Sequence, residues 1–279
     1  MEGRTTTITT KNNDIQVVNE VKKKRKPIRD IYIMGVSLII ILVVWEFFGR
    51  QINPIFASYP TAILEAFFGL IGDGSLVTAL FQSIQPLIAG YLLAAIIGIP
   101  IGLLIGRYRI IEAAINIYVI AGYATPLVAL IPLFVLWFGL GFAVKVAIVF
   151  TLTIFPIIIN TTDGVKGVPK TMIEVGTAFV ASQSAIMRKI ILPATIPYIM
   201  TGLRLGVGKA VIAMVIAEFF TSISGLGGII INSGNNFDTA KMFVPVIILM
   251  ILGVGLTALV GKLESVVAPW QDKMGRRQD

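Results

Sequence analysis

The chain has 279 residues, of which 56% are hydrophobic and only 14% are charged, and it contains neither Cys nor His. Soluble globular proteins are about half apolar and a quarter charged, so this composition predicts that lipid is the main solvent. Without Cys or His, thiol nucleophiles, disulfides, iron–sulfur clusters and the usual zinc and haem ligands are excluded. We therefore expect no cofactor and no metal. The net charge of +8 lies mostly beside apolar segments, which indicates membrane topology and not nucleic-acid binding.

The first 30 residues form a polar and then basic tail, which we expect to be cytoplasmic. Residues 1–20 are Thr-rich and have no hydrophobic period, which predicts a disordered segment. The basic run at 22–29 precedes an apolar run and is compatible with a signal peptide. However, the apolar run is about 18 residues long and no small-residue cleavage site follows it, so an uncleaved anchor is favoured.

Six apolar stretches can each cross a hydrocarbon core of about 30 Å as a helix. The runs are continuously apolar and do not alternate, which favours helices over a barrel. The sequence therefore predicts an all-α membrane protein, with a transmembrane domain over 31–270 and a short cytoplasmic tail over 271–279. The predicted spans are 31–49, 77–105, 111–138, 142–160, 195–220 and 243–263.

The distribution of Lys and Arg beside the spans predicts the orientation. About sixteen of these residues fall on the side of the two termini, and only Arg50, Lys145 and Lys241 fall on the other side. Positive residues accumulate on the cytoplasmic side of membrane proteins. We therefore expect both termini to be cytoplasmic.

Gly98, Gly102 and Gly106 repeat every four residues in the second predicted span and so share one helix face. A face without side chains lets a neighbouring helix approach closely. Ordinary tight packing within the bundle, without a further role, is the favoured interpretation.

The longest predicted cytoplasmic loop, 161–194, exceeds what a turn between two spans requires. Its pattern predicts a short helix with Ile173, Thr177 and Val180 on one side. Ser182 is a candidate cap for a second short helix that ends before Pro193. Two short, partly apolar helices with little charge between them suit a docking surface for another protein.

This loop resembles the Glu-Ala-Ala loop of binding-protein-dependent ABC importer permeases of the type I fold. Glu174, Val175 and Gly176 occupy the first three positions of that pattern, and Ile-Ile-Leu-Pro at 190–193 matches its ending. Val180 stands where the family usually has Gly. The residues that the resemblance assigns to coupling with an ATPase are Glu174, Gly176, Ala178, Ala181, Ser182, Ile190, Leu192 and Pro193.

The resemblance extends from about residue 59 to 270 and is strongest to the nitrate, taurine and sulfonate branch of the family. Each matching fragment is weak alone, but their order and spacing agree with the family. The fragments are Ala-Thr-Pro at 124–126, Leu-Trp-Phe-Gly at 136–139, Phe-Pro-Ile-Ile-Ile-Asn-Thr at 155–161, Leu-Pro-Ala at 192–194, Thr-Gly-Leu-Arg-Leu-Gly at 201–206, Ala-Glu-Phe-Phe at 217–220 and Gly-Leu-Gly at 225–227.

What the resemblance implies is a permease subunit in the inner membrane that is not itself an enzyme. A second permease copy, identical or paralogous, would complete the pathway, and two cytoplasmic ABC ATPase subunits would grip the loops. A periplasmic or lipid-anchored binding protein would deliver the substrate. That substrate would be nitrate, taurine or another sulfonate, or a vitamin or precursor such as riboflavin or a thiamine pyrimidine. Glu174 would orient the loop, and residues 181–187 would form the helix that the ATPase holds.

Three ionisable residues lie in the fifth predicted span, where charge is costly and therefore a candidate for function. Arg204 and Glu218 share a helix face but lie about 21 Å apart along the axis, whereas Lys209 points elsewhere. One hypothesis is that Arg204 or Lys209 lines the passage and that Glu218 lies near its outer mouth. The favoured alternative is that each charge is held by backbone carbonyls or by another helix.

Three other functions compete with this interpretation. Residues 206–210 resemble the end of a phosphate-binding loop, but Leu203 and Ala210 replace the required Gly and Ser or Thr. An intramembrane enzyme would lack His, Cys or paired Asp residues in the spans. A secondary transporter or channel without ATPase partners is the remaining alternative, and it would not need a long docking loop.

Overall fold

The computed structural model describes residues 4–11, 14–21, 27–221 and 224–269. Strand β1 (Arg4–Lys11) pairs with the antiparallel strand β2 (Asp14–Val21), with Arg4 opposite Val21 and Lys11 opposite Asp14. The sequence pattern predicts a disordered segment over residues 1–20, whereas in the structure the described residues of this segment form two paired strands. Both strands are rich in Thr, Ile and Val, whose branching at Cβ favours extended backbone.

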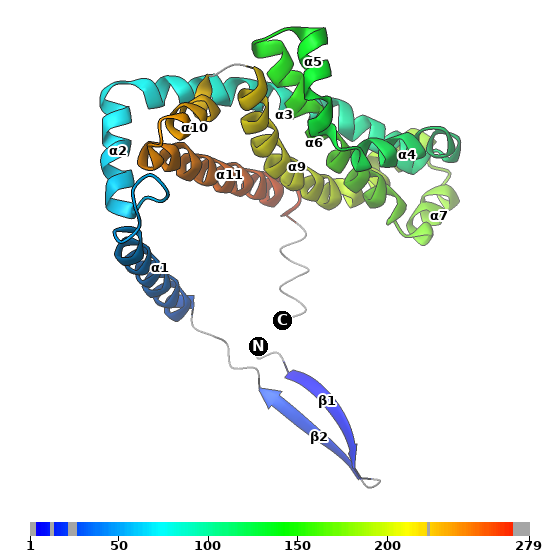
Figure 1. The fold of residues 1–279 in the computed structure, drawn as a ribbon. Helices are drawn as coiled ribbons and strands as arrows, with labels where there is room; N and C mark the ends of the chain where they lie inside the picture. Colours follow the sequence, from blue (N-terminus) through cyan, green and yellow to red (C-terminus); the bar gives the residue numbers. More distant parts are fainter. Residues whose placement is uncertain (1–3, 12–13, 22–26, 222–223, 270–279) are drawn as a thin grey trace.

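The rest of the described chain is helical (Figure 1). By length and composition, five of its helices can cross a membrane, or six if one bent pair counts as a single span. The α-helices are α1 (Pro27–Gly49), α2 (Pro60–Gly72), α3 (Ser75–Arg107), α4 (Arg109–Ala124), α5 (Ile131–Phe138), α6 (Phe142–Lys166), α7 (Lys170–Ala178), α8 (Gln183–Ile186), α9 (Leu192–Thr221), α10 (Gly225–Asn235) and α11 (Thr239–Val267). A 3₁₀ turn, η1 (Leu127–Leu130), precedes α5, and a π-helical turn, η2 (Met187–Ile191), precedes α9.

The predicted span 111–138 is broken in the structure. Its two halves, Arg109–Ala124 and Leu127–Phe138, are bent by 86° relative to each other. The break lies at Thr125 and Pro126. Proline disfavours helical backbone in the residue before it, and Thr125 is extended, with ψ of 136°. Pro126 also lacks the N–H that would continue the helix.

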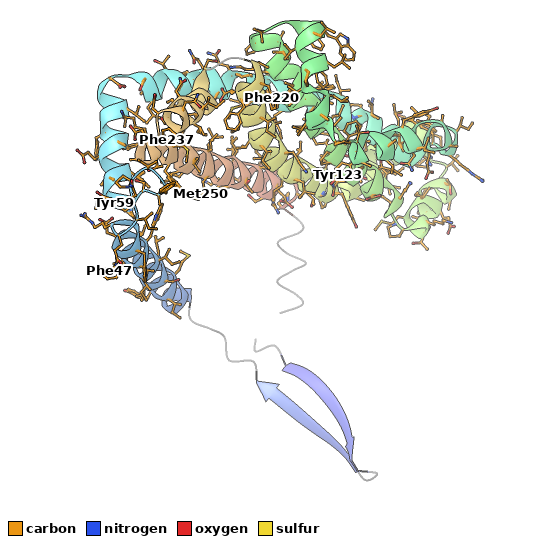
Figure 2. All side chains as sticks on the ribbon, in the orientation of Figure 1. Phe47, Tyr59, Tyr123, Phe220, Phe237 and Met250 are labelled. Carbon is orange, nitrogen blue, oxygen red and sulfur yellow. The ribbon has the colours of Figure 1, made fainter. Side chains whose placement is uncertain are left out.

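Helices α3, α6 and α9 form the centre of the molecule, and α6 packs against both others (Figure 1). Fully buried aliphatic side chains such as Ile148 and Ile157 of α6 and Met214 of α9 fill the contacts. Helix α1, in contrast, extends away from this centre, and most of its described apolar side chains, including Phe47 but not Trp45, are exposed in the single chain (Figure 2).

The glycine face of α3 lies against α6. A Cβ added at Gly102 would lie 2.6 Å from Cβ of Thr161, and one added at Gly106 would lie 2.6 Å from Cβ of Val165. Gly98 is less tight, at 3.2 Å from Cγ2 of Ile157. Real Cβ atoms do not approach within 3.0 Å, so the two helices can pack this closely at Gly102 and Gly106 only because side chains are missing there.

Candidate functional site

The first candidate site is the segment over residues 170–193, here called the coupling segment. Helix α7 (Lys170–Ala178) lies within it, and α8 begins after Ser182. The prediction that Val180 lies on the first of these helices is wrong, because α7 ends two residues before it. The Ser182 hydroxyl accepts a hydrogen bond from the Ala185 N–H at 3.2 Å, so Ser182 caps α8 as the sequence predicts.

The turn between α7 and α8 is tight even though it lacks the family's glycine. Val180 has φ of +54°, a left-handed conformation that is a genuine outlier for a β-branched residue. The Val180 N–H donates to the Thr177 carbonyl at 2.9 Å, and the Ala181 N–H donates to the Gly176 carbonyl at 3.0 Å. These bonds complete the end of α7, as in common helix C-caps. The bend is therefore present, with strain of about 1–2 kcal/mol at Val180.

The second helix of the coupling segment does not end before Pro193, which contradicts the sequence-based expectation. Residues Gln183–Thr221 instead form one helical run of 39 residues. The π-helical turn η2 lies immediately before Pro193. Its wider hydrogen-bonding pattern accommodates a proline that would otherwise clash with the preceding turn and leave a carbonyl without its donor.

The base of the coupling segment is anchored on the central helices. Ile186 and Ile191 are buried against Val165, at the end of α6. A Cβ at Gly176 would lie 2.8 Å from Cδ1 of Ile190, so the glycine allows α7 to pack against η2. This packing makes the segment part of the folded bundle.

The tip of the coupling segment is apolar and exposed. Phe179 and Val180 are 83% and 90% exposed, and Met172 and Val175 on α7 are also exposed. Among the coupling residues predicted from the sequence, Glu174, Ala178 and Ser182 are exposed and Gly176 is buried, whereas Ala181, Ile190, Leu192 and Pro193 are half-buried. Exposed large apolar side chains beside a polar rim are typical of protein interaction sites.

The three predicted intramembrane charges have different surroundings and do not form one site. Arg204 lies 2.5 Å from the carboxylate of Glu264 on α11. It also borders an open groove between α9 and α11 with a volume of about 750 Å³. Lys209 is exposed on the surface of the single chain. Glu218 is completely buried at the opposite end of α9 from the coupling segment.

Glu218 belongs to a polar cluster, defined here as Gln82, Ser83, Lys145, Glu218 and Ser224. Within it, Ser83, Lys145 and Glu218 are buried, Ser224 is half-buried and Gln82 is exposed. The Ser83 hydroxyl donates to Oε1 of Glu218 at 2.7 Å, and Nζ of Lys145 lies 3.8 Å from the same oxygen. Nζ of Lys145 also donates to the Ser224 hydroxyl at 2.8 Å. The cluster thus joins α3, α6 and α9 and compensates two charges that would be costly in an apolar interior.

The cluster also holds the start of α10. The backbone N–H groups of Gly225, Leu226 and Gly227 donate respectively to Gln82 Oε1 at 2.9 Å, Ser83 Oγ at 2.9 Å and Glu218 Oε2 at 2.8 Å. The first N–H groups of a helix have no partner within the helix, and a carboxylate there is favoured by the helix dipole. Three side chains therefore satisfy three of these donors.

Sequence reasoning missed Gln82, Ser83 and Lys145. The sequence pattern assigned Lys145 to the outer boundary of a span as a topology charge. In the structure Lys145 lies on α6 and its side chain is buried. A lysine four residues into an apolar helix is itself a signal, because a buried ionisable residue requires a partner. Ser83 and Gln82 carry no such signal, since neutral polar residues are common in helices.

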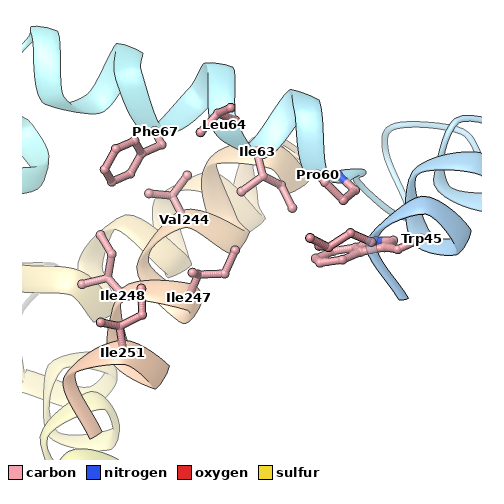
Figure 3. Close-up of a pocket in the computed structure, with 10 residues that line it drawn as sticks. Trp45, Pro60, Ile63, Leu64, Phe67, Val244, Ile247, Ile248 and Ile251 are labelled. Carbon is pink, nitrogen blue, oxygen red and sulfur yellow. The ribbon is translucent and has the colours of Figure 1, made fainter. Parts of the chain in front are cut away.

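The structure also contains an apolar pocket of about 400 Å³ between α1, α2 and α11 (Figure 3). Trp45 from α1, Phe67 from α2 and Ile247 from α11 are among the side chains that line it. The pocket walls carry no titratable side chain, so this cavity offers packing but no acid, base or charged ligand group.

Comparison with known proteins agrees with this architecture. Residues 98–268 match the family model of the binding-protein-dependent transport system inner membrane component. The formylaminopyrimidine transport permease protein ThiX of Halalkalibacterium halodurans is 32% identical over 84% of this chain and 94% of its own. The nitrate import permease protein NrtB of Leptolyngbya laminosa is 30% identical over 89% and 91%.

A solved structure of the MetNI methionine ABC transporter in inward-facing conformations contains a chain with the same fold. Its TM-score is 0.57 at 19% identity, over 69% of this chain and 96% of that one. The family match at 98–268 includes the coupling segment and, of the polar cluster, Lys145, Glu218 and Ser224. This multi-pass membrane protein therefore belongs to the family of binding-protein-dependent transport system inner membrane components and has the type I ABC importer permease fold.

Proposed function

We propose that the chain is the membrane-spanning subunit through which an ATP-driven importer moves a small solute across the inner membrane, and that the coupling segment receives the ATPase. The observation that carries this proposal is the exposed apolar tip at Phe179 and Val180, set on a base that packs against α6. A simple turn between two helices needs no such packed base, whereas a segment that transmits movement from a partner to the helices needs one.

The proposed assembly contains two ABC ATPase subunits, a second permease copy that is identical or paralogous, and a periplasmic or lipid-anchored binding protein. The excess of Lys and Arg beside the termini supports a cytoplasmic location for both termini and for the coupling segment. ATP hydrolysis takes place on the separate ATPase chains, because residues 206–210 lack the groups that bind phosphate and magnesium.

The proposed substrate is a small anion such as nitrate, taurine or another sulfonate, or a vitamin or precursor such as riboflavin or a thiamine pyrimidine. Relatives named for nitrate and for formylaminopyrimidine support both classes. The exposed ammonium group of Lys209 supports the anion, because a cation at membrane depth attracts negative charge. Arg204 is less available, since Glu264 pairs with it.

The direct test is co-purification of the detergent-solubilised chain with its candidate ATPase. The test variant combines Glu174→Lys with a scrambled sequence at 181–187. The matched control is Glu65→Lys, which reverses an exposed charge on α2, outside the coupling segment. We expect the native chain and the control to retain the ATPase and the test variant to lose it while still inserting in the membrane.

The opposite result would be equally informative. If the test variant retains the ATPase as well as the native chain does, or if neither chain retains it, the coupling segment is not an ATPase site. A secondary transporter or channel without ATPase partners then becomes the better description.

A further inference from the structure

The coupling segment and the polar cluster lie near opposite ends of one continuous helix. The helical run Gln183–Thr221 begins at the Ser182 cap and contains Glu218 three residues before its end. At 1.5 Å per residue, 39 helical residues span about 58 Å, which is well beyond the hydrocarbon core of about 30 Å. Figure 1 shows α7 at one end of the bundle and α10 toward the other.

The central helices are already in close contact along much of this length. The glycine contacts join α3 to α6, and Gly202 of α9 approaches α6 in a similar way, with an added Cβ 3.0 Å from Cβ of Asn160. Packed interiors of this density transmit displacement because they deform little. At the end of α9 near α10, however, the helices are joined by charge and hydrogen bonds.

The contact between Glu218 and α10 is so close that no side-chain atom fits on Gly225 or Gly227 at the start of α10. Gly225 has φ of +75°, and a Cβ there would lie 1.9 Å from Oε1 of Glu218. A Cβ on Gly227 would lie 2.8 Å from Cβ of Glu218. The carboxylate is therefore held from several sides, by Ser83 of α3, Lys145 of α6 and the backbone of α10.

We propose that Glu218 and Lys145 are positioning residues for transport. They fasten the start of α10 to the far ends of α3, α6 and α9, so that these elements move as one rigid body when the ATPase displaces the coupling segment. This inference rests on the proposed function. It assigns to the polar cluster the task of carrying movement from the coupling segment to the opposite membrane face.

The end of helix α10 lies at the protein surface, so a displacement of α10 would move surface residues. It ends in exposed polar residues at Asn235 and Asn236, and Phe237 beyond them is 66% exposed (Figure 2). A loose joint at Glu218 would let α9 move while α10 stayed behind. ATP would then be hydrolysed without a matching movement at the far side.

The first experiment measures substrate uptake per ATP hydrolysed by the complete complex in proteoliposomes. Glu218→Gln keeps the side-chain shape but removes the charge. Lys145→Met with Glu218→Gln removes both charges and leaves no lone buried ion. We expect both variants to keep ATPase binding and hydrolysis and to lose about tenfold in uptake per ATP, the factor corresponding to one charge-assisted hydrogen bond. The control Glu112→Gln breaks an exposed pair with Lys166 and should leave the ratio unchanged.

The second experiment measures rigidity directly and needs no substrate. Because the chain contains no Cys, spin labels can be placed at Thr78→Cys on α3 and Asn235→Cys on α10. In the otherwise native protein we expect one narrow distance distribution, the same without nucleotide and with ATP trapped. With Glu218→Gln we expect a distribution that is broader and shifts with nucleotide.

Each outcome decides a separate point. A native distance that changes on ATP binding, or a Glu218→Gln distance as narrow as the native one, overturns the rigid-body proposal. Uptake and hydrolysis that fall in equal proportion would also overturn it, because that pattern indicates general damage.

If Glu218→Gln fails to insert, Ser83→Ala removes one bond to the carboxylate while both charges remain, and the same distances test the proposal. Failure of the native chain to bind the ATPase would reject the proposed function, yet the nucleotide-free distances would still test the joint.

Discussion

The two ends of the helical run Gln183–Thr221 are built on opposite principles. At the coupling segment, apolar side chains such as Phe179 are exposed and the polar groups cap a helix. At the polar cluster, the charged groups of Lys145 and Glu218 are buried and pair with each other. An exposed apolar surface gains free energy when a partner covers it, whereas a buried ion pair holds its own helices in one arrangement.

This difference predicts which property of the protein a substitution at each end will reduce. Changes at the exposed tip of the coupling segment should reduce partner binding and leave the fold intact. Changes at the polar cluster should reduce the stability of the chain itself, because an unpaired charge there remains buried and an added atom overlaps its neighbours. Four measurements test this contrast, in order of decreasing expected effect.

The largest effect is expected for Lys145→Met, which leaves the Glu218 carboxylate buried without its cation. Removing one partner of a buried pair costs about 3–5 kcal/mol. The thermal midpoint of the purified protein should therefore fall strongly. The matched control is Lys166→Met, whose exposed pair with Glu112 should be worth less than about 1 kcal/mol. Equal midpoints for the two variants would contradict the structural importance of the cluster.

Gly225→Ala should be the next most damaging change. Both its left-handed backbone and the contact with Glu218 oppose a Cβ, and the two costs together are roughly 2–5 kcal/mol. Gly74→Ala is a close control, because Gly74 also has φ of +75° but a Cβ there would meet nothing within 4 Å. The difference between the two melting temperatures measures the steric contact with the carboxylate. No difference would show that the cluster can relax.

Ser182→Ala tests the other end of the run. It removes the cap of α8 at a cost of about 1 kcal/mol, which should weaken ATPase binding severalfold without impairing insertion. Binding of the ATPase to immobilised protein measures the change. Thr78→Ala removes an exposed hydroxyl on α3, outside the coupling segment, and should bind normally. Similar losses in both variants would argue against the cap.

The smallest effect is expected for Val180→Gly compared with Val180→Ala. Both variants remove the exposed side chain, but only glycine adopts φ of +54° without strain. The glycine variant should therefore be more stable than the alanine variant by about 1 kcal/mol, measured by hydrogen exchange at the end of α7. Equal exchange rates would show that the turn changes its conformation when the side chain is removed.

The cap at Ser182 illustrates what could be predicted from the sequence in this region. A serine before a short helical pattern is a local signal, and the structure confirms the cap. The end predicted before Pro193 was wrong because the π-helical turn η2 absorbs the proline. The left-handed turn at Val180 carried no residue signal, because Val is a poor residue for that conformation.

The membrane class, the apolar helices and the family resemblance of the 170–193 segment could be predicted from the sequence alone, because hydropathy and short motifs are local properties. The structure was needed to show that the span at 111–138 bends by 86°, that Gln183–Thr221 is continuous, and that Lys145 pairs with Glu218. The bonds of the polar cluster join residues up to 143 positions apart. Such pairs depend on how helices pack against one another, and no local pattern in a single sequence encodes that distance.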